Sequence, residues 1–214
     1  MIRPTQKNNL SPIEPKRCAL LIIDMQNAFV APGAVFETPG AREMIPRLTE
    51  LIDFARKSRI PIIWTQSDHS PPYGGIMLKK FPVITNERVL WPGDITFELY
   101  ADMPQPHETE LEHLIVKHKY DSFFETPLDS VLRFHRVDTV IITGTATNAC
   151  CESTARSAFM RDYDVLFLSD LTATFDSAMH EATLRNIALL FGRVITTVEL
   201  LNELSVRSAD SLPA

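Results

Sequence analysis

The chain has 214 residues, of which 45% are hydrophobic and 22% are charged, a balance typical of a soluble globular protein with a single domain. Its formal net charge of −6 disfavours phosphate backbones, and no stretch approaches the roughly 18 apolar residues of a membrane span, so we expect neither nucleic-acid nor membrane partners. Three cysteines, of which Cys150 and Cys151 are adjacent, cannot form a disulfide framework, and this indicates a reducing, cytoplasmic compartment.

The N-terminal segment is polar and contains three prolines before residue 16. It lacks the apolar centre of a secretory signal, which agrees with a cytoplasmic location. We therefore predict an N-terminal arm over residues 1–16 and a single domain over residues 17–214.

Six short apolar runs are nearly continuous in Ile, Val and Leu, which is typical of strands buried on both faces of a parallel sheet. They are Cys18–Ile23, Ile60–Trp64, His113–Val116, Thr139–Ile142, Asp164–Leu168 and Arg193–Thr196. Between them lie apolar residues at helical spacing: Ile45, Leu48, Leu51, Ile52 and Ala55; Cys151, Ala155, Ala158 and Phe159; Ala182, Leu184, Ala188 and Leu189. This alternation predicts a three-layer α/β/α sandwich with a six-stranded, mainly parallel, Rossmann-like sheet.

Residues 67–110 interrupt the alternation with a stretch rich in proline and glycine. We predict a long excursion with one short helix near residues 94–100. Long connections in compact domains usually carry function. The excursion could be a lid, a pocket wall or a subunit contact, and the sequence leaves these three open.

Polar residues whose side chains can take part in a reaction follow three of the predicted strands. Asp24 ends the first run, Lys117 ends the third, and Cys150 comes soon after the fourth, at the start of a helix. Each has an ordinary explanation by itself: a helix cap, a solvated cation and a small buried hydrophobe. Ligands of open parallel sheets bind beyond the carboxyl ends of the strands, so the three should converge there. A thiol at a helix N-terminus beside an ammonium group is expected to have a lowered pKa.

Helical spacing distinguishes the two adjacent cysteines. Cys151 shares an apolar stripe with Ala155 and Ala158, whereas Cys150 lies about 100° away from it. The pattern therefore predicts that Cys150 is the reactive thiol and that Cys151 belongs to the core.

The six histidines are isolated, and no zinc-binding spacing of histidine or cysteine occurs. They are His69, His107, His113, His118, His135 and His180. We therefore expect no metal and no cofactor.

Four segments resemble the isochorismatase-like cysteine hydrolases, and the likeness extends over about residues 17–204. The segments are 19–29 (ALLIIDMQNAF), 115–124 (IVKHKYDSFF), 126–133 (TPLDSVLR) and 143–156 (TGTATNACCESTAR). Within that superfamily the nearest likeness is to the ureidoacrylate-type amidohydrolases, through segments 91–95 (WPGDI), 123–130 (FFETPLDS) and 146–154 (ATNACCEST).

The resemblance implies a catalytic triad of Asp24, Lys117 and Cys150. It also implies a cis peptide between Thr145 and Ala146, with an oxyanion hole formed by the backbone amides of Ala146 and Cys150. Family members are commonly dimers or tetramers, so we expect a homo-oligomer. Three aromatic residues are candidates for the pocket walls: Phe29, Trp64 and Tyr120.

We therefore predict a cysteine hydrolase that uses water to cleave a C–N bond of a small amide, ureide or carbamoyl compound through a thioester on Cys150. A first alternative is a metal-dependent nicotinamidase. Nicotinamidases carry an Asp-x-His metal site at the positions of Ser67, Asp68 and His69, and here serine replaces the aspartate. A second alternative is a non-catalytic binding or assembly protein, and a third is a thiol redox role for the adjacent cysteines.

Overall fold

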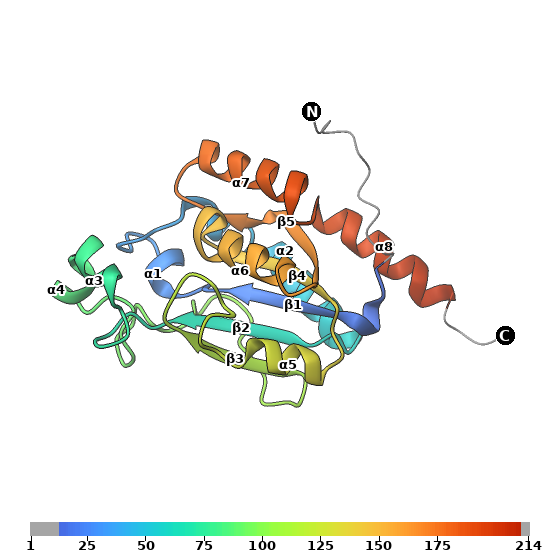
Figure 1. Cartoon of the computed structure of the whole chain (residues 1–214), viewed down its shortest axis with the longest axis horizontal. Coiled ribbons are helices and arrows are strands. Elements are labelled where there is room, and N and C mark those ends of the chain that lie inside the picture. The colour runs from blue at the N-terminus through green and yellow to red at the C-terminus, as the bar shows by residue number, and fades with distance from the viewer. Residues whose placement is uncertain (1–12, 211–214) are drawn as a thin grey trace.

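The computed structural model describes residues 13–210, so most of the predicted arm over residues 1–16 lies outside the described residues (Figure 1). A single sheet of six strands forms the middle of the molecule, and every neighbouring pair of strands is parallel. The strands are β1 (Cys18–Ile23), β2 (Ile62–Ser67), β3 (Glu112–Lys117), β4 (Thr139–Thr145), β5 (Asp164–Ala173) and β6 (Arg193–Ile195). All six predicted strands are therefore confirmed.

The strand order is β3-β2-β1-β4-β5-β6, which places β1 and β4 at the centre. Strand β1 is completely buried. Its successive side chains point to opposite faces of the sheet, and both faces are covered. Leu20 and Ile22 join one apolar cluster, whereas Leu21 and Ile23 join the other. An unbroken apolar run is thus what a central strand with helices on both faces requires.

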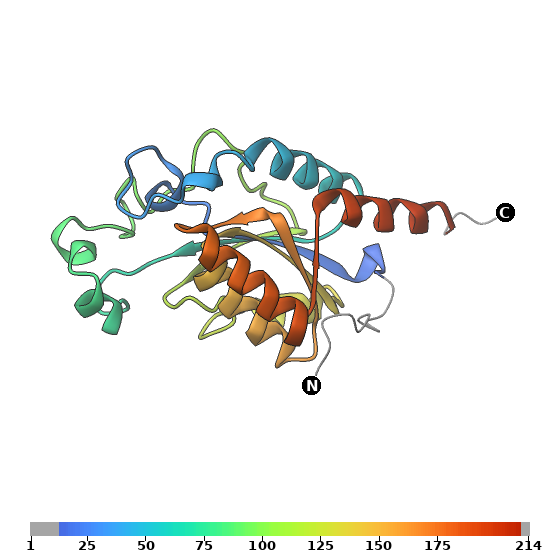
Figure 2. The ribbon, with the colours of Figure 1, turned by 90° about the horizontal axis from the view of Figure 1, so that it is seen from above.

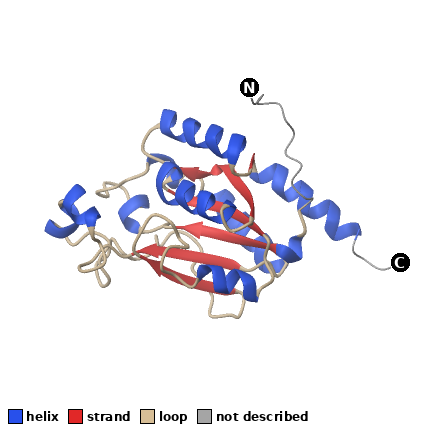
Figure 3. Cartoon of the chain, viewed as in Figure 1, coloured by secondary structure: helices blue, strands red, loops and turns tan. Residues whose placement is uncertain are grey.

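Helices cover both faces of the sheet, which confirms the three-layer sandwich (Figures 2 and 3). One face carries α2 (Ile45–Lys57) and α8 (Thr197–Asp210). The other carries α5 (Leu128–Phe134), α6 (Glu152–Phe159) and α7 (Ser177–Leu190). The remaining elements are short: η1 (Pro15–Arg17), α1 (Asn27–Val30), η2 (Pro39–Ala41), α3 (Ile76–Lys80), α4 (Val83–Asn86) and the π-helical turn η3 (Thr147–Cys151).

Strand β3 departs from the prediction that every strand is buried on both faces. It is the outermost strand, and its Leu114 and Val116 side chains are 48% and 42% exposed. Ile115, which points to the opposite face, is buried in the cluster that includes α5. An edge strand can thus carry an apolar run without being covered on both sides.

The predicted apolar stripe of α2 is confirmed, but the stripe of α7 is wrong at three of its four positions. Leu184 packs partly buried against the core, whereas Ala182, Ala188 and Leu189 are exposed, and the helix instead buries Thr183 and Ile187. This helix carries more apolar residues than its one packed side can cover, so hydrophobicity alone misplaces its phase. In α6, Phe159 is likewise 44% exposed, at the end of the stripe.

The excursion over residues 67–110 contains two short helices, α3 and α4, and none near residues 94–100. The prediction of a helix there is wrong. The Asp94 carboxylate accepts hydrogen bonds from the backbone amide and the hydroxyl of Thr96, a local turn that competes with a helix. No helix within the described residues is long and apolar enough to span a membrane.

Candidate active site

The strand order reverses direction between β1 and β4, because β2 and β3 follow on one side and β5 and β6 on the other. In open parallel sheets, this reversal leaves a crevice at the carboxyl ends of the strands where ligands bind. Asp24 follows β1 at this point, and Cys150 lies on the turn after β4. Lys117 ends β3 and reaches them from two strands away.

Asp24 is completely buried, and its carboxylate is held by three donors. Thr65 donates to Oδ1 at 2.6 Å, while Ser67 and Lys117 lie 2.9 and 2.7 Å from Oδ2. Its backbone is also anchored, because its carbonyl accepts the Thr145 hydroxyl at 2.7 Å. These bonds hold the residue at a φ of 49°, a region that aspartate tolerates better than most residues. A buried carboxylate needs such partners to stay ionised.

Lys117 has no exposed surface, and its ammonium group makes four polar contacts. Beside Asp24, Nζ donates to Ser67 Oγ at 2.9 Å, to the carbonyl of Lys119 at 3.0 Å and to Cys150 Sγ at 3.4 Å. Burial lowers its pKa, but the charge of Asp24, together with hydrogen bonds to Asp24 and Cys150, outweighs burial and leaves the pKa above its ordinary value. Lys117 is therefore a fixed cation.

Cys150 lies on η3 and is only 4% exposed. Burial raises the pKa of its thiol to about 12; Lys117 lowers the pKa, while the charge of Asp24 and a hydrogen bond to it raise it further. The lowered pKa that the sequence suggested is therefore wrong, because burial and the neighbouring carboxylate outweigh the ammonium group. The resting group is a neutral thiol beside a carboxylate that can accept its proton.

Cys151 is fully buried, and its sulfur lies 3.9 Å from the carbonyl oxygen of Thr143. Both cysteines belong to the apolar cluster beneath α6, but it is the Cys150 sulfur that contacts the Lys117 ammonium group. The structure thus separates the two cysteines as their helical phase predicted, although residues 147–151 form a π-helical turn rather than an α-helix.

The end of β4 brings the backbone against β1. A Cβ atom on Gly144 would lie 2.0 Å from the carbonyl oxygen of Ile23, and its φ of +110° also disfavours any other residue. The next peptide bond, between Thr145 and Ala146, is cis, as the resemblance implies. The carbonyl of Ala146, the residue just before η3, accepts the amides of Ala149 and Cys151, which anchors the start of that turn.

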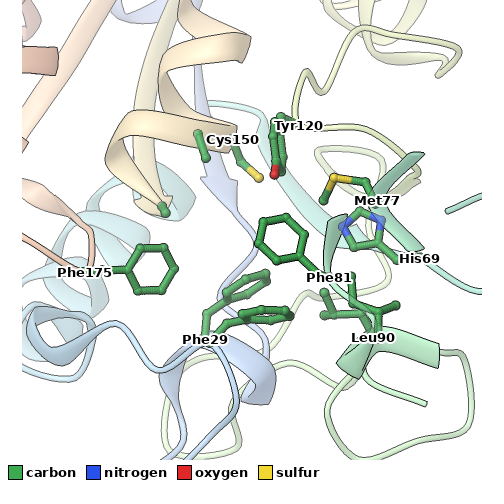
Figure 4. A pocket seen from close by; sticks show the side chains of 12 residues that line it. Phe29, His69, Met77, Phe81, Leu90, Tyr120, Cys150 and Phe175 are labelled. Atoms are coloured by element: carbon green, nitrogen blue, oxygen red, sulfur yellow. The ribbon is translucent and has the colours of Figure 1, made fainter. Parts of the chain in front are cut away.

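A cavity of about 170 Å³ opens beside the Cys150 sulfur (Figure 4). Its lining is almost entirely apolar: Phe29, Phe36, His69, Met77, Phe81, Ile84, Leu90, Tyr120, Ala146, Ala149, Cys150 and Phe175. Two of the three predicted wall residues, Phe29 and Tyr120, are among them. Trp64 is not: it is buried in the core and donates to Glu112 at 3.1 Å. The prediction failed because β2 extends to Ser67, which leaves Trp64 in mid-strand.

The excursion forms one wall of the cavity, so of the three roles left open it serves at least as a pocket wall. Its Met77, Phe81 and Leu90 side chains face Cys150 across the cavity (Figure 4). Phe81 packs edge-on against Phe36, with ring centroids 5.8 Å apart, which joins the excursion to the loop after α1. No sequence pattern predicted these wall residues, because they belong to a segment without regular periodicity.

Thr65 and Ser67 are residues of the candidate site that the sequence interpretation missed. Both lie at the carboxyl end of β2, and both hold the Asp24 carboxylate. Alternation along the strand could have identified them, since residues 65 and 67 share a side, once the strand had been extended to its true end.

The segment from Ser67 to His69 does not assemble a metal site. The Ser67 hydroxyl is engaged between Lys117 and Asp24, and the Asp68 carboxylate accepts the backbone amide of Ser70. No cluster of three or more His, Cys, Asp or Glu side chains suited to a metal occurs within residues 13–210.

Residues 18–199 match the family model of the isochorismatase domain. Nicotinamidase 3 of Arabidopsis thaliana is 34% identical, with the match covering 84% of this chain and 85% of the relative. A ureidoacrylate amidohydrolase of Methylobacterium radiotolerans is 32% identical, with coverage of 92% and 83%. Among solved structures, a cysteine hydrolase of Pseudomonas syringae pv. phaseolicola superposes with a TM-score of 0.87 at 27% identity, covering 94% of this chain and 99% of that one.

Proposed function

The chain belongs to the isochorismatase family of hydrolases, and from this premise we propose that it cleaves the C–N bond of a small amide, ureide or carbamoyl compound through a thioester on Cys150. One observation carries the proposal. A thiol, an ammonium group and a carboxylate are in mutual contact, and the thiol lines an apolar cavity.

The first half of the reaction forms the thioester. As the Cys150 sulfur attacks the substrate carbonyl carbon, its proton passes to the Asp24 carboxylate. The carbonyl oxygen becomes an oxyanion, which the amides of Ala146 and Cys150 stabilise, an effect worth about 3 kcal/mol per donor in comparable enzymes. Asp24 then gives the proton to the leaving nitrogen, the C–N bond breaks and the amine departs.

The second half hydrolyses the thioester. Asp24, again a carboxylate, takes a proton from water while the water oxygen attacks the acyl carbon. The C–S bond breaks, the acid leaves, and the proton returns to the Cys150 sulfur. Lys117 stabilises the charge on the sulfur and on the carboxylate throughout, because its Nζ contacts both groups.

A panel of small amides, ureides and carbamoyl compounds assayed for amine or ammonia release tests the proposal. Cys150→Ala should abolish turnover, whereas Cys151→Val should retain most of it, since Cys151 is a core residue close in volume to valine. Mass spectrometry of the quenched reaction should find the acyl adduct on the peptide that carries Cys150. Turnover that survives in Cys150→Ala would rule out the thioester.

A nicotinamidase is the second candidate, and the 34% identity to Nicotinamidase 3 favours including nicotinamide in the panel. Ser67, which stands where nicotinamidases carry a metal-binding aspartate, hydrogen-bonds to Asp24 and Lys117 instead. We therefore expect activity without an added metal. Exhaustive EDTA treatment should therefore leave the rate unchanged. A loss that zinc, iron or manganese restores would support the metal-dependent mechanism instead.

A further inference from the structure

Helix α7 places polar side chains on the side that packs against the rest of the protein. The helix lies next to α6 on one face of the sheet (Figures 1 and 2). His180 is half-buried and Thr183 is buried, and Ile187 follows about one turn later on the same side. Ala182 and Leu189, by contrast, are exposed. A helix that only had to bury apolar surface would turn such residues inward, so its inward polar side chains have another use.

These polar side chains of α7 bond to the turn that carries Cys150. His180 Nδ1 lies 3.0 Å from the hydroxyl oxygen of Thr147, which is the first residue of η3 and is completely buried. The Thr183 hydroxyl donates to the carboxylate of Glu152, the residue directly after η3, at 2.6 Å. Each end of the turn is therefore tied to α7 by one side-chain hydrogen bond, and Cys150 lies between the two ends.

A third bond holds the same turn from the loop that leads into α7. The Thr174 hydroxyl donates to the side-chain oxygen of Asn148 at 2.5 Å. Phe175, the next residue, lines the cavity beside Cys150 (Figure 4). Asp176 then accepts two backbone amides of the first turn of α7, which fixes the start of the helix. The corner between β5 and α7 is thus a frame around η3.

The position of η3 decides how deeply the Cys150 sulfur is buried and how it lies against Lys117. Cys150 is 4% exposed, and its sulfur is 3.4 Å from the Lys117 ammonium nitrogen. A misplacement of about 1 Å can lower the rate of an enzyme about a hundredfold. We propose that His180 is a positioning residue, which holds the nucleophile turn η3 in place by its bond to Thr147. The inference rests on the proposed function, since it takes Cys150 as the nucleophile.

The first test compares His180→Ala with His180→Asn, whose side-chain amide can take the place of Nδ1 toward Thr147. With a substrate from the panel, His180→Ala should lower kcat at least about tenfold and leave KM within about twofold. Iodoacetamide should label Cys150 at least about threefold faster, because a displaced turn leaves the sulfur less buried. His180→Asn should return both values toward those of the wild type. Labelling that is not faster in His180→Ala, or no recovery in folded His180→Asn, would overturn the role of His180.

Ile187→Ala is the matched control, which separates positioning from a general loosening of α7. Ile187 is completely buried on the same side of the helix, but its apolar side chain cannot hydrogen-bond to η3. Ile187→Ala should lower the urea midpoint at least as much as His180→Ala, because it leaves a cavity in the core. It should nevertheless keep kcat and the labelling rate of Cys150 in native buffer within about twofold of the wild type. Equal effects of the two variants on kcat and labelling would contradict a specific role for His180.

Labelling also separates this inference from the proposed function, because it needs no substrate. If the wild type hydrolyses no compound of the panel, the thioester proposal fails for these compounds, yet the order of labelling rates should stay the same. Thr147→Val removes the other partner of the bond, so it should speed labelling of Cys150 as His180→Ala does. The double variant should label no faster than the faster single variant, because both changes remove one interaction. Gains that multiply in the double variant would refute a path from His180 to Cys150 through Thr147.

Discussion

Removing the buried ammonium group should destabilise the protein far more than removing an exposed one. In Lys117→Met the side chain keeps its length but loses its charge, and Asp24 remains in a fully buried site with the Thr65 and Ser67 hydroxyls and the Cys150 thiol but no cation. Breaking a buried ion pair by removing one partner typically costs about 3–5 kcal/mol. With a urea slope of about 2.5 kcal/mol per molar, the unfolding midpoint should fall by about 1.5 M.

The matched control is Arg133→Met on the surface of α5. Arg133 forms a 2.9 Å pair with Asp129 but is 69% exposed, so this variant should lose less than about 1 kcal/mol. Adding Asp24→Asn to Lys117→Met should recover part of the lost stability, because the amide carries no unpaired charge. If Lys117→Met proves no worse than Arg133→Met, or if the double variant is the less stable of the two, then the Asp24–Lys117 pair is not the buried ion pair described here.

Three further predictions follow from the same geometry. Because Asp24 raises the pKa of the Cys150 thiol, Asp24→Asn should label with iodoacetamide faster than the wild type at every pH between 7 and 9, and slower labelling would contradict that role. His69 has a folded pKa of about 4 against an ordinary 6.5, so it contributes stability above pH 6.5 that is lost as the pH falls toward 4. At about 1.4 kcal/mol per pH unit the loss is at most about 3.5 kcal/mol, and urea titrations should show a smaller loss in His69→Leu. Gly144→Ala should cost about 3 kcal/mol or more in urea unfolding, since its Cβ would meet the Ile23 carbonyl at 2.0 Å; a loss below 1 kcal/mol would mean that the two strands can separate.

The cytoplasmic location, the homo-oligomeric state and the oxyanion hole stay predictions of the sequence. Size-exclusion chromatography with light scattering would test the second of these directly. The exposed Leu114 and Val116 on β3 make that edge of the sheet the first place to look for a subunit contact.

Sequence alone predicted the architecture, which the structure confirms, and the three residues of the candidate site, which the structure brings together. Unbroken apolar runs identify strands buried on both faces, and the residue that ends such a run in a parallel sheet lies at its functional edge, so Asp24, Lys117 and Cys150 could be found from local pattern. The distinction between Cys150 and Cys151 was equally local, because it depends only on helical phase.

Tertiary structure decided the chemistry at those positions. The protonation state of Cys150 depends on burial and on Asp24, which is 126 residues away along the chain, so a motif that suggested a thiolate was misleading. The hydroxyls that hold Asp24 and the side chains that line the cavity come from β2 and from an aperiodic excursion. Electrostatic energies and cavity shape depend on distances between segments remote in sequence, and only the packed structure sets those distances.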